Sequence, residues 1–327
     1  MFYNSRHNMA WRRWLVGLCL LAGLSVASAA FPERPVRILI GFTPGTTGDV
    51  LLRLLAPKLS ERWGQPVVVD NRPGAGSSLA AEAVAKAPAD GYTLLLSTSA
   101  NVINASLPTP QKVDFLGDLM PLTLLADNPV VLVTSGSSSS RQLADLISAA
   151  RSAPARMSFA SSGNGTFTHL YGELFNQSAG VKLIHVPYKG STQALSDVMS
   201  STVDVAFSPV TPVLGLVKSG KLRALGVIGR ARLTDWPDVP TLAQAGIAGF
   251  DSALWFGLNA PAGTPTDVAQ RITQDFQWAL SQPDIQAQLV AKGIHPMPTG
   301  AGAFRELIQR EQAQWVRLVR QANIQAD

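Results

Sequence analysis

Short apolar runs alternate with amphipathic patterns along most of the chain. The runs are rich in β-branched residues and are bounded by Gly, Pro, Asn and Asp, which is typical of buried strands. We expect strands at Val36–Ile40, Pro66–Asp70, Thr93–Ser97, Val130–Thr134, Ser158–Ala160, Leu183–Val186, Val203–Phe207, Arg223–Ile228 and Trp255–Leu258.

Helical patterns separate these strands. From Asp49 onward, apolar residues recur at helical spacing as far as Leu59. Further helices are expected after Thr166 as far as Phe175, and at Ser77–Ala87, Leu143–Ala150, Thr192–Met199, Val213–Lys218, Thr266–Leu280, Ile285–Lys292 and Ala303–Gln321. This alternation predicts an α/β protein with two successive units, each a mainly parallel sheet flanked by helices.

The first thirty residues have a different pattern. Arg6, Arg12 and Arg13 precede an apolar run from Trp14 to Val26, which ends in the small residues Ala27–Ala30. Basic, apolar and small residues in this order indicate a cleavable signal peptide, and the run is short for a membrane span. We expect residues 1–30 to direct export to the periplasm, with cleavage after Ala29 or Ala30.

Removing this segment changes the composition. The net charge of the full chain is +5, and the rest of the chain has 24 basic against 22 acidic residues, a surplus of +2. The single cysteine, Cys19, is lost as well, so the mature chain must be stabilised by core burial without disulfides. The mature part has no basic run, and we expect no nucleic-acid partner.

Three candidate binding loops follow predicted strands. The first is Gly41–Asp49, the second Ser97–Asn101, and the third Ser161–Thr166 with His169 one turn into the next helix. Ligands of doubly wound sheets gather at such strand ends, where glycines admit a ligand and backbone amides favour an anion. Asp49 is better explained as a helix cap, because its carboxylate would repel an anion.

Other chemistries fit the residues less well. The first loop lacks the Lys-Ser/Thr of a P-loop, and His169, His185 and His295 are isolated in a chain without mature cysteines, so we expect no nucleotide cofactor and no metal. Ser162 with His169 could form a hydrolytic pair, but no Gly-x-Ser-x-Gly elbow is present and a capping serine is the commoner explanation.

Taken in order, these segments resemble the receptors of tripartite tricarboxylate transporters, also called the Bug or TctC-type family. The matching segments are Phe31–Val36, Phe42–Gly45 with Asp49, Gly64–Gly76, Ala89–Leu94, Ser162–Thr166 with His169, His185–Gly190, Gly220–Leu225, Pro237–Thr241, Trp255–Leu258 and Ala260–Pro265. They extend over essentially the whole mature chain. One departure is Thr46-Thr47, where the family usually has further glycines, which puts the pose of the bound carboxylate in question.

The resemblance implies a two-domain periplasmic binding protein that closes over its ligand. Residues 31–128 plus 253–327 would form a discontinuous N-terminal domain, and residues 129–252 the second domain. Backbone amides and ordered water would hold one carboxylate in place of an arginine. The contacts implied by position are Phe42, Gly45, Thr46, Thr47, Thr98, Ser99, Asn101, Ser162, Gly163, Gly165, Thr166 and His169, with Asp204 on the far side. His169 could instead orient its loop.

The function implied is capture of a small organic carboxylate or dicarboxylate and delivery to the membrane permease subunits of a tripartite transporter. We expect a monomer without enzymatic activity. Two alternatives stay open at this point: an orphan receptor of the same fold that signals to a sensor kinase, and an exported serine hydrolase using Ser162.

Overall fold

The computed structural model describes residues 31–108, 112–188, 190–229, 231–250, 253–322 and 324. The chain divides into two units, Met1–Glu33 and Arg34–Asp327, and every element below belongs to the second. The predicted signal peptide, residues 1–30, and Cys19 within it lie outside the described residues.

The first of two sheets combines strands from both ends of the chain. Its order is β11-β4-β10-β3-β1-β2. The strands are β1 (Val36–Ile40), β2 (Val67–Asn71), β3 (Thr93–Thr98), β4 (Leu119–Asn128), β10 (Leu254–Pro261) and β11 (His295–Thr299). β1 pairs in parallel with β2 and β3, whereas β10 is antiparallel to β3 and β4, and β11 is antiparallel to β4.

The second sheet is built from one continuous stretch of chain, in the order β7-β6-β8-β5-β9. Its strands are β5 (Val130–Ser135), β6 (Ser158–Ser161), β7 (Ile184–Pro187), β8 (Val205–Pro209) and β9 (Leu222–Ile228). β6 is parallel to β7 and β8, and β5 is antiparallel to β8 and β9. Val131, Val133, Val198 and Val213 are among the residues that form its buried core.

The α/β class is confirmed, and both sheets are mixed. We expected mainly parallel pairing because we did not consider that the chain passes from the first sheet to the second and back, which adds antiparallel pairs. β4 leads through Pro129 directly into β5, and β10 returns beside β4, so these two strands run in opposite directions.

Two strands were not predicted at all. β11 contains Pro296 and Pro298 and lies at the edge of its sheet, where proline is tolerated because one side of the strand has no partner. β4 contains Pro121, which pairs with Asn259 beside a register shift. We did not predict strands in these two segments because proline is uncommon in strands.

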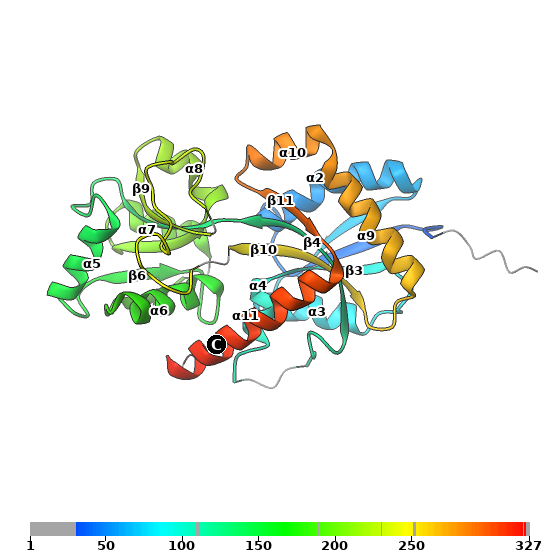
Figure 1. The fold of residues 1–327 in the computed structure, drawn as a ribbon, viewed down its shortest axis with the longest axis horizontal. Helices are drawn as coiled ribbons and strands as arrows, with labels where there is room; N and C mark the ends of the chain where they lie inside the picture. Colours follow the sequence, from blue (N-terminus) through cyan, green and yellow to red (C-terminus); the bar gives the residue numbers. More distant parts are fainter. Residues whose placement is uncertain are drawn as a thin grey trace, which may run out of the picture. The chain divides into compact units, whose positions relative to one another are not determined.

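Helices cover the sheets (Figure 1). They are α2 (Thr47–Trp63), α3 (Ser78–Ala85) preceded by the 3-10 turn η1 (Ala75–Ser77), α4 (Ser99–Asn104), α5 (Leu143–Ser152), α6 (Phe167–Ala179), α7 (Ser191–Met199), α8 (Val210–Lys218), α9 (Thr266–Ser281), α10 (Pro283–Val290) and α11 (Ala301–Gln321). α2, α9 and α10 contact one another and the first sheet, as α3, α4 and α11 do in a second group. No helix of the described residues is long and apolar enough to span a membrane.

The C-terminal helix α11 contacts both halves of the structure, as its course in Figure 1 shows. Against β10, Phe304 packs edge-on to Trp255, with 5.3 Å between ring centroids. Towards its end, Trp315 packs edge-on to Tyr171 of α6 at 5.6 Å. α11 therefore links the first sheet to the helix that follows the third candidate loop.

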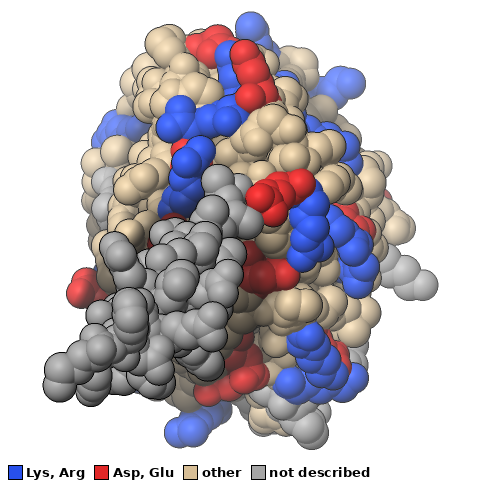
Figure 2. All heavy atoms as spheres, turned by 90° about the vertical axis from the view of Figure 1, so that its right-hand side faces the viewer, with Lys and Arg blue, Asp and Glu red and all other residues tan. Residues whose placement is uncertain are grey.

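Charged side chains of both signs are interspersed over the face of the molecule drawn in Figure 2. Among the described residues, Arg34 forms an ion pair with Asp90 at 2.8 Å and Lys58 forms one with Asp284 at 3.2 Å. This distribution agrees with the near balance of acidic and basic residues in the sequence.

Candidate functional site

The first candidate loop lies between β1 and α2 and is fastened by Asp49. Gly45, at a φ of 84°, donates its amide to Asp49 Oδ2 at 2.9 Å. Asn71 at the end of β2 donates to Asp49 Oδ1 and to the carbonyl of Phe42, at 3.1 and 3.0 Å. The interpretation of Asp49 as the helix cap was wrong, because the N-cap of α2 is Thr46 and Asp49 is the third residue of the helix. Its carboxylate instead fastens the first loop to the start of α2.

Asp49 is buried and ionised. Burial raises its pKa, but hydrogen bonds from Arg53, Gly45 and Asn71 together outweigh burial and lower the pKa below its ordinary value. The Arg53 side chain is 54% exposed, so the bonds to the backbone and to Asn71 are the better shielded ones.

We expect Asp49→Asn to lower the free energy of unfolding by about 1.5 kcal/mol, because charge-assisted hydrogen bonds to the loop are lost. Arg53→Met is the matched variant, since it removes the exposed ion pair and leaves the bond from Gly45 in place. Urea denaturation should show a loss of about 0.5 kcal/mol for it. Equal losses for the two variants would contradict the role of Asp49 in holding the loop.

The second candidate segment is not a loop. Thr98 ends β3 and Ser99 begins α4, so the strand passes directly into a helix. Thr98 Oγ1 accepts the amide of Ala100 at 3.2 Å, and Asn101 Oδ1 accepts the amide of Thr98 at 3.0 Å. This reciprocal capping satisfies the backbone where a loop was expected.

Two polar side chains of this segment have different environments. Asn101 Nδ2 donates to Ser77 Oγ at 3.2 Å and so ties α4 to η1. Ser99 is 2% exposed, and its hydroxyl has no hydrogen-bond partner within the described residues.

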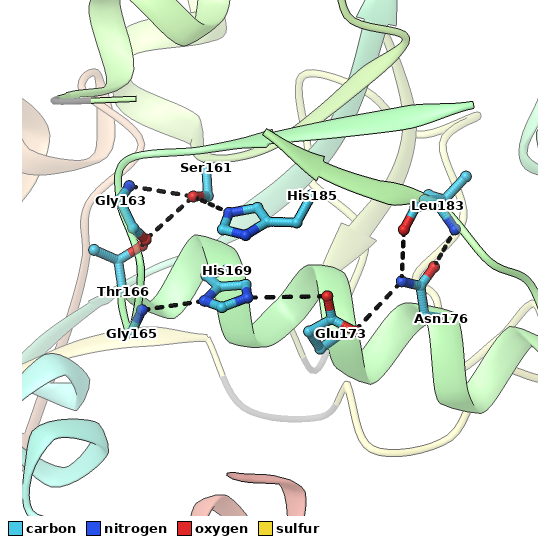
Figure 3. A network of polar contacts seen from close by, with 9 residues as sticks. All are labelled: Ser161, Gly163, Gly165, Thr166, His169, Glu173, Asn176, Leu183 and His185. Atoms are coloured by element: carbon cyan, nitrogen blue, oxygen red, sulfur yellow. Dashed lines mark hydrogen bonds and ion pairs between the residues drawn. The ribbon is translucent and has the colours of Figure 1, made fainter. Parts of the chain in front are cut away.

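The third candidate loop, between β6 and α6, is held by a polar network (Figure 3). Ser161 Oγ lies 2.6 Å from His185 Nε2 and accepts the amide of Gly163 at 3.2 Å. His169 Nδ1 accepts the amide of Gly165 at 3.1 Å, and its ring stacks on that of His185 with centroids 3.8 Å apart. His169 is 8% exposed, which fits a residue that positions the loop.

Four amides of this loop form hydrogen bonds within the protein. Besides Gly163 and Gly165, Ser162 donates to Thr168 Oγ1 at 2.9 Å, and Thr166 donates to the carbonyl of Gly163 at 3.4 Å. The sequence predicted amides directed at an anion. In the structure these N–H groups fasten the loop, so an anion at this loop would have to share them or be bound by hydroxyl groups.

Glu173 continues the network along α6. Burial raises the pKa of its carboxyl group, and a hydrogen bond from Asn176 acts in the opposite direction. Its Oε1 lies 3.9 Å from His169 Nε2. The hydroxyl of Ser162 forms a hydrogen bond with Thr168 Oγ1, at 3.0 Å. Its partner is therefore a threonine, and Ser162 does not pair with His169 as a hydrolytic site would require.

A cleft of about 530 Å³ lies between the first-sheet segments and the third loop. Five predicted residues line it, namely Phe42, Asn101, Ser162, Gly165 and Thr166. The remaining lining residues are Ala75, Gly76, Ser78, Leu79, Ala81, Glu82, Ala100, Asn104, Ala105, Leu107, Lys112, Val113, Phe115, Asn164 and Phe167. The turn cluster Asn71–Gly76 before an Ala-rich helix was the signal that could have identified part of this set.

Other predicted residues lie behind the lining or away from it. Those outside the lining are Gly45, Thr46, Thr47, Thr98, Ser99, Gly163, His169 and Asp204. Asp204 is hydrogen-bonded to the amide of Ser158 at 2.7 Å, where β6 begins, whereas the third loop follows the end of β6. Asp204 therefore lies at the opposite end of this strand from the cleft.

Thr46 and Thr47 fit the first loop despite their restricted backbones. Thr46 has an extended conformation with a φ of −72°, and its hydroxyl donates to the carbonyl of Thr43 at 3.0 Å. Thr47 is the first residue of α2. The positive φ that the turn requires is taken by Gly45.

Comparison with known proteins identifies the family of this chain. The sequence model of the family described as "Tripartite tricarboxylate transporter family receptor" matches residues 51–324. The chain belongs to this family. It is therefore a receptor of the periplasmic solute-binding type, and the resemblance read from its loops is confirmed.

Relatives of the receptor family include proteins with bound ligands. Protein BugT of Bordetella pertussis is 35% identical, over 90% of this chain and 91% of its own. The structure described as "R. palustris Rpa4515 with adipate" is 33% identical with a TM-score of 0.82, and covers 91% of this chain and 100% of its own. MatC (Rpa3494) from Rhodopseudomonas palustris with bound malate is 29% identical with a TM-score of 0.78, over 88% and 100%.

Metal binding has no support in the residues that the structure describes. No group of three or more His, Cys, Asp or Glu side chains is assembled there in a way that could hold an ion. Receptors of this family are solute-binding proteins.

Proposed function

We propose that the cleft captures a small organic carboxylate and that the protein delivers it to the membrane permease subunits of a tripartite tricarboxylate-type transporter. The observation that carries this proposal is the cleft itself, whose lining brings Phe42 and Asn101 together with Ser162, Gly165 and Thr166. The family match and the relatives that hold adipate and malate support it.

Five residues are assigned to the ligand and the others to its support. Phe42, Asn101, Ser162, Gly165 and Thr166 would contact the carboxylate or its neighbouring atoms. Gly45, Thr46, Thr47, Thr98, Ser99, Gly163 and His169 would hold the three segments in position. Asp204 would serve the second sheet through its bonds to Ser158.

The cleft would close by movement of two domains. Residues 31–128 plus 253–327 would form one domain and residues 129–252 the other, with the hinge at Pro129 and at the return of the chain before Leu254. This division is supported by the two sheets, because strand pairing changes from one to the other between β4 and β5. Export to the periplasm would require residues 1–30, removed after Ala29 or Ala30.

Binding is testable on the refolded, ligand-free chain. We expect at least one member of a panel of carboxylates to stabilise it, by about 2.7 kcal/mol at a ligand concentration one hundred times Kd. Thermal unfolding with and without ligand measures this, and calorimetry gives the affinity. A panel of linear, hydroxylated and aromatic carboxylates that produces neither stabilisation nor heat would contradict the proposal.

A further inference from the structure

The walls of the cleft are mostly apolar. Large apolar side chains contributed by several segments line it, namely Phe42, Leu79, Leu107, Val113, Phe115 and Phe167. Ligand pockets generally combine such a lining with a few polar groups that orient the ligand. The cleft volume of about 530 Å³ lies within the usual range for small-molecule pockets, roughly 300–1,000 Å³.

Leu79 is the large apolar side chain most open to solvent in this lining. It lies in the first turn of α3 and is 48% exposed, although large apolar residues are ordinarily buried. A Cβ on Gly74 would lie 2.7 Å from Leu79 Cδ1, so the leucine side chain lies directly over the glycine backbone. Leu79 therefore presents an apolar surface to the cleft that a ligand would cover.

Leu107 shows that the apolar wall reaches the third loop. Leu107 is 7% exposed, and a Cβ on Gly165 would come within 3.1 Å of its Cδ1. A ligand whose carboxylate lies near Ser162 and Thr166 would thus place the rest of its body against leucine and phenylalanine side chains.

The charges of the lining do not favour a second carboxylate. Among the described lining residues, the charged side chains are Lys112 and Glu82, which lie 3.7 Å apart. Lys86 also binds Glu82, at 2.7 Å, and a hydrogen bond from Lys86 together with the charge of Lys112 lowers the pKa of the Glu82 carboxyl group. A second ligand carboxylate near Lys112 would therefore also meet an ionised glutamate.

We propose that the cleft selects a monocarboxylate with an apolar body, either a medium-length alkyl chain or an aromatic ring, over dicarboxylates. This inference rests on the proposed function, because it concerns the ligand of the same cleft. It differs from what MatC and Rpa4515 hold, since malate and adipate both carry two carboxylates.

Hexanoate and adipate provide a matched pair of probes, because they have the same chain length and differ in one terminal carboxylate. With the refolded full chain, we expect calorimetry to give a Kd at least about tenfold lower for hexanoate or benzoate than for adipate, succinate or malate. Equal or tighter binding of a dicarboxylate overturns this inference and leaves the proposed function intact. Failure of every probe counts against the proposed function itself.

Leu79→Asn tests the apolar wall. Because Leu79 is half exposed, the variant should fold, and we expect hexanoate to bind about tenfold more weakly, as for the loss of apolar contact in a pocket. Val290→Asn is the matched control, since Val290 is 56% exposed on α10 and is not part of the lining. Unchanged hexanoate affinity in Leu79→Asn, with normal thermal unfolding, overturns the inference.

Discussion

Asp275→Asn will lower the free energy of unfolding by about 3 kcal/mol. Asp275 is 1% exposed and joins α9 to α2. It accepts hydrogen bonds from Trp63 Nε1 at 2.7 Å and from Arg62 and Arg271. An asparagine would place an amide donor among these donors, and the buried Trp63 N–H and the two guanidinium groups would lose a charged acceptor.

Asp284→Asn is the control, because it removes the same charge on the neighbouring helix α10. Asp284 is 54% exposed, and its pair with Lys58 spans 3.2 Å. Its loss should cost about 0.5 kcal/mol. Urea denaturation of the parent and both variants measures the difference, and similar losses for Asp275→Asn and Asp284→Asn would contradict the role of the buried carboxylate.

The effect of Asp275→Asn should depend on pH. Burial raises the pKa of Asp275, but hydrogen bonds from Trp63, Arg62 and Arg271 outweigh burial and lower it. A carboxyl group with a lowered pKa in the folded state stabilises the protein fully above its unfolded pKa, about 3.9, and loses this contribution as the pH falls through the folded value. The difference between parent and variant should be constant from pH 5 to 7 and shrink below pH 4.

Gly41→Ala is the second substitution with a large expected effect. A Cβ on Gly41 would lie 2.1 Å from Ser77 Oγ and 2.3 Å from Ser77 Cα. A rotamer change cannot relieve the contact with Cα, so the backbone of η1 must move. Ser77 is fully buried and accepts the hydrogen bond from Asn101, so the displacement reaches the cleft lining. We expect the free energy of unfolding to fall by about 3 kcal/mol and the affinity for a carboxylate to fall at least about tenfold.

Gly302→Ala is the control, because it adds the same methyl group at a position with room for it. Gly302 lies in α11, and nothing lies within 4 Å of the added carbon. Because Gly302 is the second residue of the helix, we expect stabilisation by less than the roughly 1 kcal/mol typical of a helix interior. If Gly41→Ala unfolds at the same denaturant concentration as the parent and binds normally, the close approach of the first loop to η1 has no importance for the site.

The strands that carry the candidate loops could be predicted because their patterns are local. Val36–Ile40 and Thr93–Thr98 are short apolar runs followed by turn or capping residues, and Ser158–Ser161 leads into a glycine turn. Local patterns also identified the first and third loops, although the cap of α2 is Thr46 and not Asp49. The transition at Thr98 was wrong because reciprocal bonds with Asn101 allow the strand to enter a helix without a loop.

The apolar wall of the cleft could not be predicted in this way. Leu79, Leu107 and Phe115 belong to segments that meet only when the chain folds, and each has the pattern of an ordinary core residue. The position of Asp204 could not be predicted for the same reason. Asp204 precedes β8, and its distance from the cleft depends on how β8 pairs with β6. Sequence periodicity identifies the helices and strands. Which side chains come together at one end of a sheet depends on how strands distant in the sequence pair.

The interleaved order of strands in the first sheet also constrains how the protein folds. β10 lies between β3 and β4, and α11 packs on β4 only after nearly the whole chain is available. The second sheet uses residues 130–228 without interruption, so its contacts are closer in sequence. Since distant contacts form more slowly than local ones, residues 130–228 should become structured first. The earlier residues would then stay exposed until the last strands arrive to complete their sheet.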